Sequence, residues 1–517
     1  MKIERTKNAT RNIFFGGLLK MYQLIVPFIM RTLMIYLLGP GYAGLNGLFT
    51  SVLQVLNLAE LGVGSAMVFS MYKPISEDDK DTICALMLLY RSYYRVIGLV
   101  IAIIGSILIP FIPNLIKADL PSDMNIYILY IMNLVATVLS YWLFAYRNSI
   151  LAAHQRNDVT SKVALVTDTI KYILQIGVLY LFRNYYLYII IILITQIINN
   201  IVTALISQKM YPDYNPKGKL DRNEIRVING RIRDLFTSKI GMVVVNSADA
   251  IVVSSFMGLT SLAIYQNYFF PVNAVMGLVT VIYQACTAGI GNSIITETEE
   301  KNYYDFKKFT FLITYISSLC STCFLVLMQP FMEIWMGKRL MLGYPFVVCL
   351  VAYFYISEIN RLLNLYKDAA GLWHEDRFRP IITAITNLVM NIIMVQYWGL
   401  YGVILSTVLS MVIVGMPWIL HNLFSVLFSR KLLTDYLKVI SKYLLISVFV
   451  IGTSCLLMLR IKGNLWVEMI IRLVLSVLVV NLLFYIIYRK KQEYTDVMDL
   501  IRKMTKGKVS LNKIGIK

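Results

Sequence analysis

The chain has 517 residues, of which 58% are hydrophobic and 15% are charged, and its mean hydropathy is +0.66. Soluble domains carry about 25% charged residues, so the composition excludes an ordinary soluble protein and indicates an integral membrane protein. The 49 Lys and Arg residues outnumber the 29 Asp and Glu residues, an excess that in a soluble chain would suggest nucleic-acid binding.

A helix needs about 20 apolar residues to cross the hydrocarbon core of a membrane, and the sequence predicts an all-α polytopic membrane protein with about 14 transmembrane helices. The candidate spans are 12–38, 42–70, 92–116, 124–150, 158–182, 185–207, 236–257, 261–293, 309–331, 345–370, 378–398, 399–424, 438–459 and 466–488. Several exceed about 25 residues, which indicates tilt or ends outside the hydrocarbon. The pairs 158–182/185–207 and 378–398/399–424 have almost no loop between them, so the count lies between 12 and 14.

The lysines and arginines set the predicted orientation. With both termini in the cytoplasm, the basic residues left outside are Lys117, Arg183, Lys338, Arg339, Arg460 and Lys462. Those within spans are Lys20, Arg31, Lys171, Arg361 and Arg472. All the others face the cytoplasm, as the positive-inside bias requires. The net charge of +20 therefore indicates orientation and attraction to anionic inner-leaflet lipids, and no nucleic-acid partner is expected.

The motifs of covalent chemistry and of cofactor binding are missing from the sequence. It contains no GxxxxGK[ST] phosphate loop, and His154, His374 and His421 are scattered, so we expect no metal site and no cofactor. Cys320 and Cys323 fit helix packing better than a redox pair. The external loops are short, which argues against an enzyme, and the first span lacks a signal-peptide cleavage site. We expect secondary or passive transport, with coupling to protons, sodium or membrane potential left open.

Two stretches of the sequence repeat in order. LLGPGYAGLNGLF (37–49) corresponds to FMGLTSLAIYQNYF (256–269), which aligns Gly39 with Gly258, and ELGVGSAM (60–67) corresponds to TAGIGNSI (287–294). An even number of spans separates the two copies, so both halves have the same orientation. This pattern predicts a parallel repeat about an axis normal to the membrane, an architecture that transporters use.

The repeat predicts the domain organisation. We expect an N-lobe at 1–207, a basic cytoplasmic linker at 208–235, a C-lobe at 236–424, two additional spans at 425–488 and a basic cytoplasmic tail at 489–517. In the linker, Ile225, Ile228, Ile232 and Leu235 recur at helical spacing. They predict an amphipathic helix on the inner membrane surface, with a solvated connector as the alternative.

Four stretches resemble a known family: TRNIFFGG (10–17), LGPGYAGLNGLF (38–49), NSADAIVVSSFMG (246–258) and YKDAAGLWHEDRFRPIITAITNLVMNI (366–392). Together they resemble the polysaccharide flippases of the multidrug/oligosaccharidyl-lipid/polysaccharide exporter superfamily. The resemblance implies two six-helix bundles that open alternately to either side of a bacterial cytoplasmic membrane. It also implies a substrate, the undecaprenyl-diphosphate-linked oligosaccharide repeat unit, and as partners a polysaccharide polymerase and glycosyltransferases of the same pathway.

The first span carries Lys20 and Arg31 on one helix face, about 16 Å apart along the axis. A cation within a membrane helix is costly and turns away from lipid, so it marks a functional site by default. Arginine binds phosphate with a bidentate fork, and lysine binds it as a point charge. We therefore expect both residues to line a cavity and bind a lipid diphosphate. A structural ion pair, or snorkelling of Lys20, is the alternative.

Asp249 lies nine residues before Gly258, and Arg31 lies eight before Gly39. The repeat therefore places these two charges at nearly the same depth. We expect a pair between the lobes that closes the outer side and breaks when substrate phosphate competes for the arginine. Pairing of each residue within its own lobe has equal weight.

Three further sites carry ionisable groups within spans. Asp168 and Lys171, like Glu358 and Arg361, are opposite charges at i,i+3 spacing, which is also how a helix neutralises costly charges. The two cations are candidates for substrate binding, and the two carboxylates are candidates for gating or coupling. Glu60 lies about 13 Å along the axis from the level of Arg31, too far for a direct pair, and is a further coupling candidate.

The sequence thus favours a flippase that moves lipid-linked oligosaccharide by alternating access and performs no covalent chemistry. A cation-coupled multidrug extruder and a lipid II flippase of the same superfamily are alternatives. The cations of the first span argue against the extruder, which should prefer an acidic cavity. A polymerase or glycosyltransferase would need a catalytic loop or an acidic metal motif, and the sequence offers neither.

Overall fold

A computed structural model describes residues 5–117, 124–461 and 463–504, and within them the regular elements are all helical. The chain divides into two compact units, Met1–Gln266 and Asn267–Lys517, called unit 1 and unit 2 below. The division falls inside one helix, α10, rather than in the predicted linker, so the predicted lobe boundaries stay predictions.

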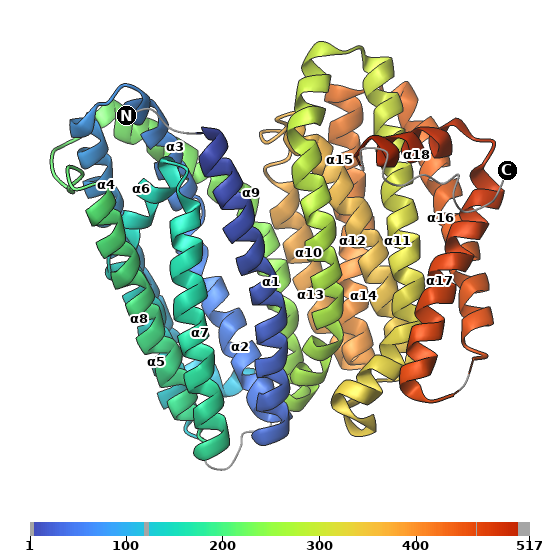
Figure 1. The fold of residues 1–517 in the computed structure, drawn as a ribbon, viewed down its shortest axis with the longest axis horizontal. Coiled ribbons are helices and arrows are strands. Elements are labelled where there is room, and N and C mark those ends of the chain that lie inside the picture. The colour runs from blue at the N-terminus through green and yellow to red at the C-terminus, as the bar shows by residue number, and fades with distance from the viewer. Residues whose placement is uncertain (1–4, 118–123, 462, 505–517) are drawn as a thin grey trace. The chain divides into compact units, whose positions relative to one another are not determined.

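Unit 1 is built from long helices joined by short breaks (Figure 1). Its elements are α1 (Arg5–Leu37), α2 (Pro40–Leu56), η1 (Asn57–Glu60), α3 (Val63–Ser76), α4 (Lys80–Leu108), η2 (Ile109–Leu115), α5 (Ile126–Trp142), η3 (Ala145–Arg147), α6 (Asn148–Ala153), α7 (Asn157–Leu181), α8 (Tyr185–Met210), α9 (Arg222–Met257) and the first turns of α10 (Leu259–Thr296). Helix α1 packs along α7, and α2 packs along α9.

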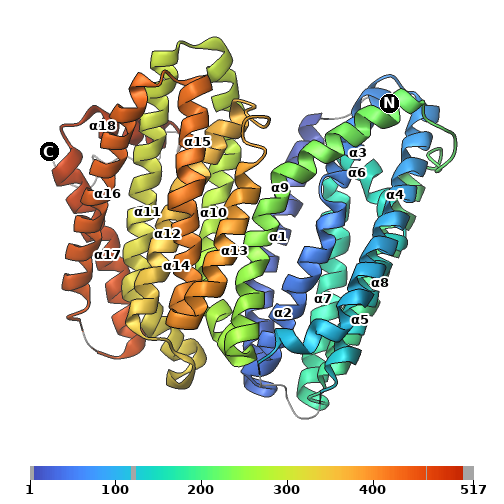
Figure 2. The same cartoon turned by 180° about the vertical axis from the view of Figure 1, so that it is seen from behind.

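Unit 2 holds the rest of α10 and the C-terminal helices (Figure 2). Its elements are α11 (Glu299–Met336), η4 (Lys338–Leu340), α12 (Tyr344–Ala369), α13 (Arg379–Trp398), α14 (Leu400–Ser410), η5 (Met411–Gly415), α15 (Met416–Asn422), η6 (Leu423–Leu427), α16 (Lys431–Met458), α17 (Leu465–Tyr488) and α18 (Gln492–Met504). Helix α11 lies at the centre, against α12, α16 and α17. Stacked aromatic rings contribute to this core. The ring centroids of Phe306 and Tyr436, for example, lie 4.6 Å apart.

The membrane-spanning prediction is confirmed. Within the described residues, 12 helices are long and apolar enough to cross a membrane, and a bent pair, Ile126–Trp142 with Ala145–Ala153, brings the count to 13. A shorter apolar helix, Val243–Met257, corresponds to the predicted span 236–257. Each of the predicted spans thus has a helical counterpart, while the count of fourteen and the side on which the termini lie stay predictions.

Two glycines give the predicted repeat a structural counterpart. Gly39, before α2, has φ 115° and ψ 164°, and Gly258, before α10, has φ 87° and ψ 172°. Positive φ with ψ near 180° is a region that essentially only glycine adopts. The residues that the sequence aligns therefore make the same turn between consecutive helices.

The predicted linker helix forms as the first part of α9. Residues 211–221 are an irregular loop, Asp221 caps the helix by accepting from Asn223 N–H, and α9 then runs without a break to Met257. Ile228 is buried, and Leu235 lies against Gly62 at the break between η1 and α3. The apolar face of the linker thus packs on the protein, and the amphipathic segment continues directly into the seventh predicted span.

The predicted cytoplasmic segments of unit 1 meet at one end. The side chain of Asn12 donates to the carbonyl of Gln155 (2.9 Å) and accepts from the backbone N–H of Asp158 (2.7 Å). Lys80 at the start of α4 pairs with Asp213 in the loop after α8 (2.5 Å), and this hydrogen bond lowers the pKa of the Asp213 carboxyl. These contacts agree with the alternating topology predicted from the charge bias.

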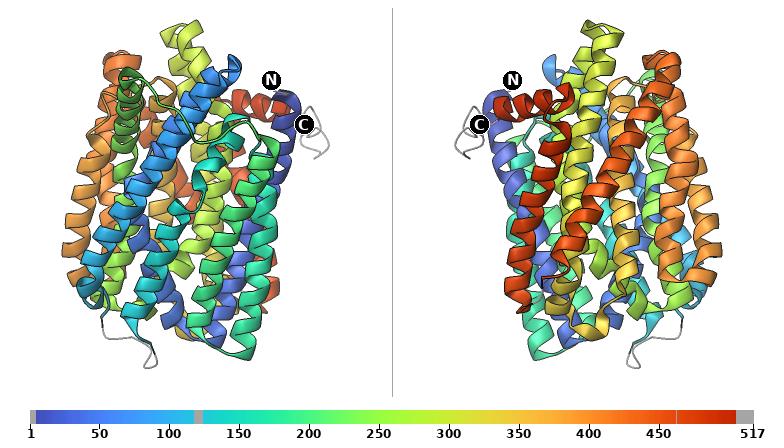
Figure 3. Two further views of the ribbon diagram at one scale, coloured as in Figure 1. Left: turned by 90° about the vertical axis from the view of Figure 1, so that its left-hand side faces the viewer. Right: turned by 90° about the vertical axis from the view of Figure 1, so that its right-hand side faces the viewer.

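In unit 2 the corresponding segments also gather at one end. Tyr304 of α11 donates a hydrogen bond to Asp496 of α18, and Asn422 donates to Asp376 between α12 and α13. Figure 3 shows α18 lying crosswise to the long helices, and its Val497 is fully buried. Only the first part of the predicted tail 489–517 lies within the described residues.

Candidate functional site

Arg31 lies two turns from the end of the apolar span Phe14–Leu37 and is partly buried. Its guanidinium donates to the carbonyl oxygen of Ala263 (3.0 Å) and to Oε1 of Gln266 (3.3 Å), both in the first turns of α10. The acceptors of the guanidinium on α10 are thus two uncharged oxygens, one from a backbone carbonyl and one from a side-chain amide. The arrangement fixes the direction of the side chain within unit 1.

Two glycines of α2 let α10 approach α2 closely. A Cβ atom added at Gly44 would lie 1.9 Å from the carbonyl oxygen of Leu259, and one added at Gly47 would lie 2.2 Å from the Gln266 side chain. Gln266 therefore contacts both Arg31 of α1 and the backbone of α2. The predicted repeat segment 37–49 thus packs against part of its own counterpart, 256–269.

Asp249 of α9 accepts a hydrogen bond from the hydroxyl of Tyr265 in α10 (3.0 Å). Tyr265 precedes Gln266, so consecutive residues of α10 contact Asp249 and Arg31. The structure thus brings the two predicted partners to the same turn of α10, and a direct pair between them stays a prediction.

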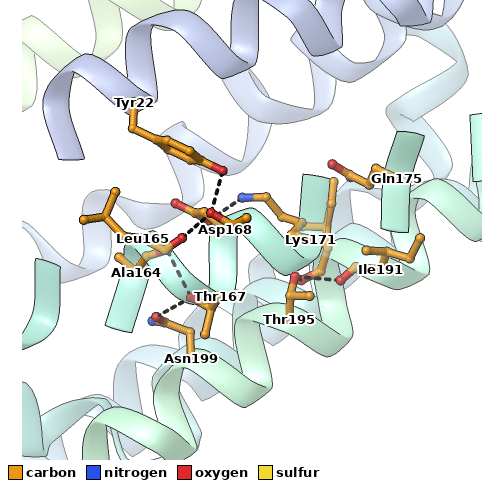
Figure 4. Close-up of polar contacts among 12 residues, drawn as sticks. Tyr22, Ala164, Leu165, Thr167, Asp168, Lys171, Gln175, Ile191, Thr195 and Asn199 are labelled. Atoms are coloured by element: carbon orange, nitrogen blue, oxygen red, sulfur yellow. Dashed lines mark hydrogen bonds and ion pairs between the residues drawn. The ribbon is translucent and has the colours of Figure 1, made fainter. Parts of the chain in front are cut away.

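Asp168 and Lys171 form an ion pair on α7, with 2.6 Å between Oδ1 and Nζ (Figure 4). The ammonium also lies 4.3 Å from the centre of the Tyr172 ring. Gln175, one turn after Lys171, is buried against α8 and donates to the carbonyl of Tyr188 (3.3 Å). Lys20, the other cation of the first predicted span, is exposed.

Glu358 and Arg361 of α12 form the corresponding site in unit 2. Glu358 is fully buried, its Oε2 accepts from the Tyr283 hydroxyl (2.9 Å), and its Oε1 lies 3.7 Å from Arg361 Nη1. Arg361 donates to the Thr280 hydroxyl (2.9 Å) and the Met276 carbonyl (3.1 Å), while its side chain stays 38% exposed. The carboxylate therefore lies in the core, and the cation reaches the surface of the unit.

Glu60 ends η1, where the second span is broken. The break continues into Gly62, which has φ 87°. Glu60 Oε1 accepts from the hydroxyl of Tyr94 (3.3 Å), which in turn accepts from the Tyr90 hydroxyl (2.6 Å). Glu60 also lines an open pocket with α3. Broken helices whose freed backbone lines a cavity are typical of transporter binding sites.

Sequence reasoning missed three buried charge networks at helix ends. Asp158 is fully buried between Arg156 and Lys162, at 2.8 and 3.2 Å. Arg472 pairs with Glu468 at 2.7 Å. In the third network Asp376 accepts from Arg379 Nε (2.6 Å) and Nη2 (2.7 Å) and lies 3.5 Å from Lys367. The i,i+3 and i,i+4 spacings within these sets were the signal that could have found them.

Comparisons with known proteins agree with this fold. The sequence model of the family described as "Polysaccharide biosynthesis protein" matches residues 9–287, more than half of the chain. No curated protein matches the chain. Among solved structures, one titled lipid II flippase MurJ, inward closed conformation, is similar with a TM-score of 0.64 and 18% identity, covering 92% of this chain and 99% of that chain.

Two multidrug transporters are also similar. An inward-facing multidrug resistance MATE family transporter of the MOP superfamily has a TM-score of 0.61 and 14% identity, with coverage of 80% and 96%. A mutant of the Vibrio cholerae MATE transporter VcmN has a TM-score of 0.51 and 13% identity, with coverage of 80% and 98%. At these identities the likeness establishes the fold and not the substrate. The chain therefore belongs to the polysaccharide biosynthesis protein family, as a multi-pass membrane protein whose fold is similar to those of the solved MurJ and MATE transporter structures.

Proposed function

We propose that the protein moves undecaprenyl-diphosphate-linked oligosaccharide repeat units from the cytoplasmic to the outer leaflet of a bacterial cytoplasmic membrane, for capsule or other surface polysaccharide. The family description supports the pathway, and the likeness to a lipid II flippase supports the class of substrate. Transport proceeds by alternating access, with the lipid tail left in the bilayer. A polymerase and glycosyltransferases of the same pathway are the proposed partners, and anionic lipids bind the basic inner face.

The observation that carries this proposal is Arg31. It lies within an apolar span, and its guanidinium is directed by a carbonyl oxygen and an amide oxygen of α10. An arginine in a membrane helix is costly, so it is retained where it contributes to function. Arginine suits the diphosphate group because its fork makes two charge-assisted hydrogen bonds to phosphate oxygens.

Lys171 and Arg361 are further proposed contacts for the diphosphate. Each has a carboxylate neighbour on its own helix, at 2.6 and 3.7 Å, and each keeps part of its surface exposed. Lys20 is exposed on the face of α1 that also carries Arg31. These cations give the headgroup three proposed sites in unit 1 and one in unit 2. The nearby carboxylates limit the cost of the cations when no phosphate is bound.

The test is transfer of an undecaprenyl-diphosphate oligosaccharide across proteoliposomes that contain the purified protein. We expect Arg31→Gln to lower the transfer rate about tenfold or more, since a hydrogen bond to a charged group contributes about 1.5–3 kcal/mol. The transfer rate of Arg31→Lys should lie between those of the wild type and Arg31→Gln, because lysine keeps the positive charge but lacks the two-pronged guanidinium. Arg339→Gln, at an exposed arginine of η4, is the matched control and should transfer normally.

Two other outcomes would change the assignment. If the wild type moves lipid II as fast as the oligosaccharide lipid, the lipid II flippase is the better description. If it moves neither lipid but exports cationic dyes, the multidrug extruder replaces the flippase. If Arg31→Gln transfers normally, the flippase stands and Arg31 has a structural role.

A further inference from the structure

A pocket lies beside the break in the second span, and none of the residues that line it is a proposed contact for the diphosphate. It is lined by one face of α3 and by Glu60, the last residue of η1, and its volume is about 490 Å³. The lining residues are Glu60, Gly64, Ser65, Val68, Phe69 and Tyr72. This volume lies within the range of about 300–1,000 Å³ that is typical of small-molecule sites.

The floor of the pocket is an oriented carboxylate. Tyr90 and Tyr94 of α4 form a hydrogen-bonded chain that ends on Glu60 Oε1. A Cβ atom added at Gly64 would lie 3.0 Å from the Tyr90 hydroxyl and 3.1 Å from Glu60 Oε1, so a larger residue would crowd both groups. The hydrogen bond from Tyr94 of α4 thus orients the Glu60 carboxylate, and Glu60 also lines the pocket.

The rim of the pocket is aromatic. Phe69 is 57% exposed and Tyr72 is 47% exposed, with their ring centroids 6.1 Å apart. Arg231 of α9 lies over the Phe69 ring at 4.8 Å and donates to the hydroxyl of Ser70 (3.2 Å). A surface that faced only lipid would not carry a carboxylate, a serine hydroxyl and an arginine together, because polar groups in hydrocarbon are costly.

This set of groups matches a sugar ring better than the other ligands of the superfamily. A carboxylate accepts hydrogen bonds from neighbouring sugar hydroxyls, and such charge-assisted bonds are strong. Aromatic side chains supply flat apolar faces for the C–H groups of the ring. The pocket has one charge of each sign at hand, Glu60 in its lining and Arg231 over the Phe69 ring, so its net charge favours neither an anionic phosphate nor a cationic drug.

We propose that Glu60, Ser65, Phe69 and Tyr72 form a carbohydrate subsite that binds the oligosaccharide of the lipid-linked substrate. The subsite rests on the proposed function and adds to it, because it separates recognition of the sugar from recognition of the diphosphate. Phe69 and Tyr72 contact the apolar faces of the sugar, and Glu60 accepts from its hydroxyls. Specificity for the repeat unit is then set in unit 1, on α3.

The test compares two lipids on the full-length protein in nanodiscs. One is undecaprenyl diphosphate without sugar. The other is the undecaprenyl-diphosphate oligosaccharide, extracted from the organism whose genome encodes this protein. The wild type should bind the glycosylated lipid at least about tenfold more tightly. Phe69→Ala and Glu60→Gln should lower that difference to about twofold, while binding of undecaprenyl diphosphate stays within about twofold of wild type. Glu60→Gln keeps an acceptor for Tyr94, and circular dichroism checks the fold of each variant.

Matched controls use residues of similar exposure outside the pocket. Phe111→Ala removes a phenylalanine that is 55% exposed, and Glu77→Gln removes an exposed carboxylate at the end of α3. Both should leave binding of the two lipids unchanged. Arg31→Gln should weaken binding of both lipids by the same factor, because it acts on the diphosphate that they share.

The outcomes separate the two proposals. If the wild type binds both lipids equally, or if the pocket variants weaken both equally, the subsite is overturned and the flippase stands. If the wild type binds neither lipid, the proposed function fails and the subsite fails with it. Tight binding of a cationic dye that Phe69→Ala abolishes would also overturn the carbohydrate assignment.

Discussion

The glycines at the start of α2 show how single residues set the packing of unit 1. Gly39 takes a backbone conformation that other residues avoid, and Gly44 and Gly47 bring the backbone of α2 to the first turns of α10. Because Gln266 also contacts Arg31, the position of the guanidinium depends on this close approach. A cationic site is thus positioned by residues that have no side chain.

Gly44→Ala tests this dependence. The added methyl would lie 1.9 Å from the Leu259 carbonyl oxygen, which is backbone and cannot rotate away. We expect an overpacking cost of about 1–3 kcal/mol, seen as a lower thermal midpoint of the purified protein, together with slower lipid transfer. Gly177→Ala, in α7 with no atom within 4 Å of the added methyl, is the control and should not lower the midpoint. An unchanged midpoint for Gly44→Ala would contradict the close packing of α2 on α10.

At the scale of elements, hydropathy predicted where the long helices lie but not where they break. The second span is interrupted at Asn57–Glu60, and the fourth bends by 47° between Trp142 and Ala145. The residues around both breaks are mostly apolar, so a hydropathy window averages over the breaks and does not locate them. The breaks bring Asn57 to the Tyr141 hydroxyl at 3.1 Å, a contact between spans that single-sequence reasoning cannot reach.

The turn between α12 and α13 likewise contains contacts that hydropathy did not predict. The sequence 366–392 contributed to the family resemblance, yet the buried network within it was not predicted. Asp376 is 2% exposed and accepts a hydrogen bond from Arg379. Its carboxylate also lies 3.5 Å from Lys367 Nζ and accepts from the Asn422 side-chain amide at 3.2 Å. The acid therefore ties the end of α12 to the start of α13 and to α15.

Asp376→Asn should destabilise unit 2 strongly. It leaves Arg379 and Lys367 buried without this carboxylate, and breaking a buried ion pair from one side costs about 3–5 kcal/mol. We expect a clear fall in the thermal midpoint and faster proteolysis of the turn. Asp368→Asn is the matched control, because Asp368 also pairs with Lys367 (2.7 Å) but is half exposed, so its loss should cost about 0–1 kcal/mol. Equal effects of the two variants would contradict a structural role for the buried network.

At the scale of the whole molecule, composition and charge bias predicted the class of protein, and the repeat predicted the paired turns at Gly39 and Gly258. The compact units do not follow the repeat, because α9 packs on α2 and α3, and the first turns of α10 contact α1 and α2. Sequence similarity within a chain identifies equivalent segments. It carries no information on which segments pack together in a given state.

The proposed pair of Arg31 and Asp249 belongs to this scale, because it would connect the two halves of the repeat. Tyr265 contacts Asp249, and Gln266 contacts Arg31, so both charged side chains contact the same turn of α10. Arg31→Asp and Asp249→Arg should each lower both the thermal midpoint and lipid transfer, since like charges then face each other. Coupled residues show interaction energies of about 0.5–3 kcal/mol, so the double exchange should restore the thermal midpoint toward wild type.

Lipid transfer should recover only partly in the double variant, because the cation then lies on α9 and no longer on the face of α1 that we propose binds the diphosphate. The difference between full recovery of the midpoint and partial recovery of transfer would separate the role of the pair in closure from the role of Arg31 in binding. A double variant that is no better than the single variants in either measurement would remove the pair. Full recovery of transfer would instead show that only the pairing matters and that Arg31 does not bind the diphosphate.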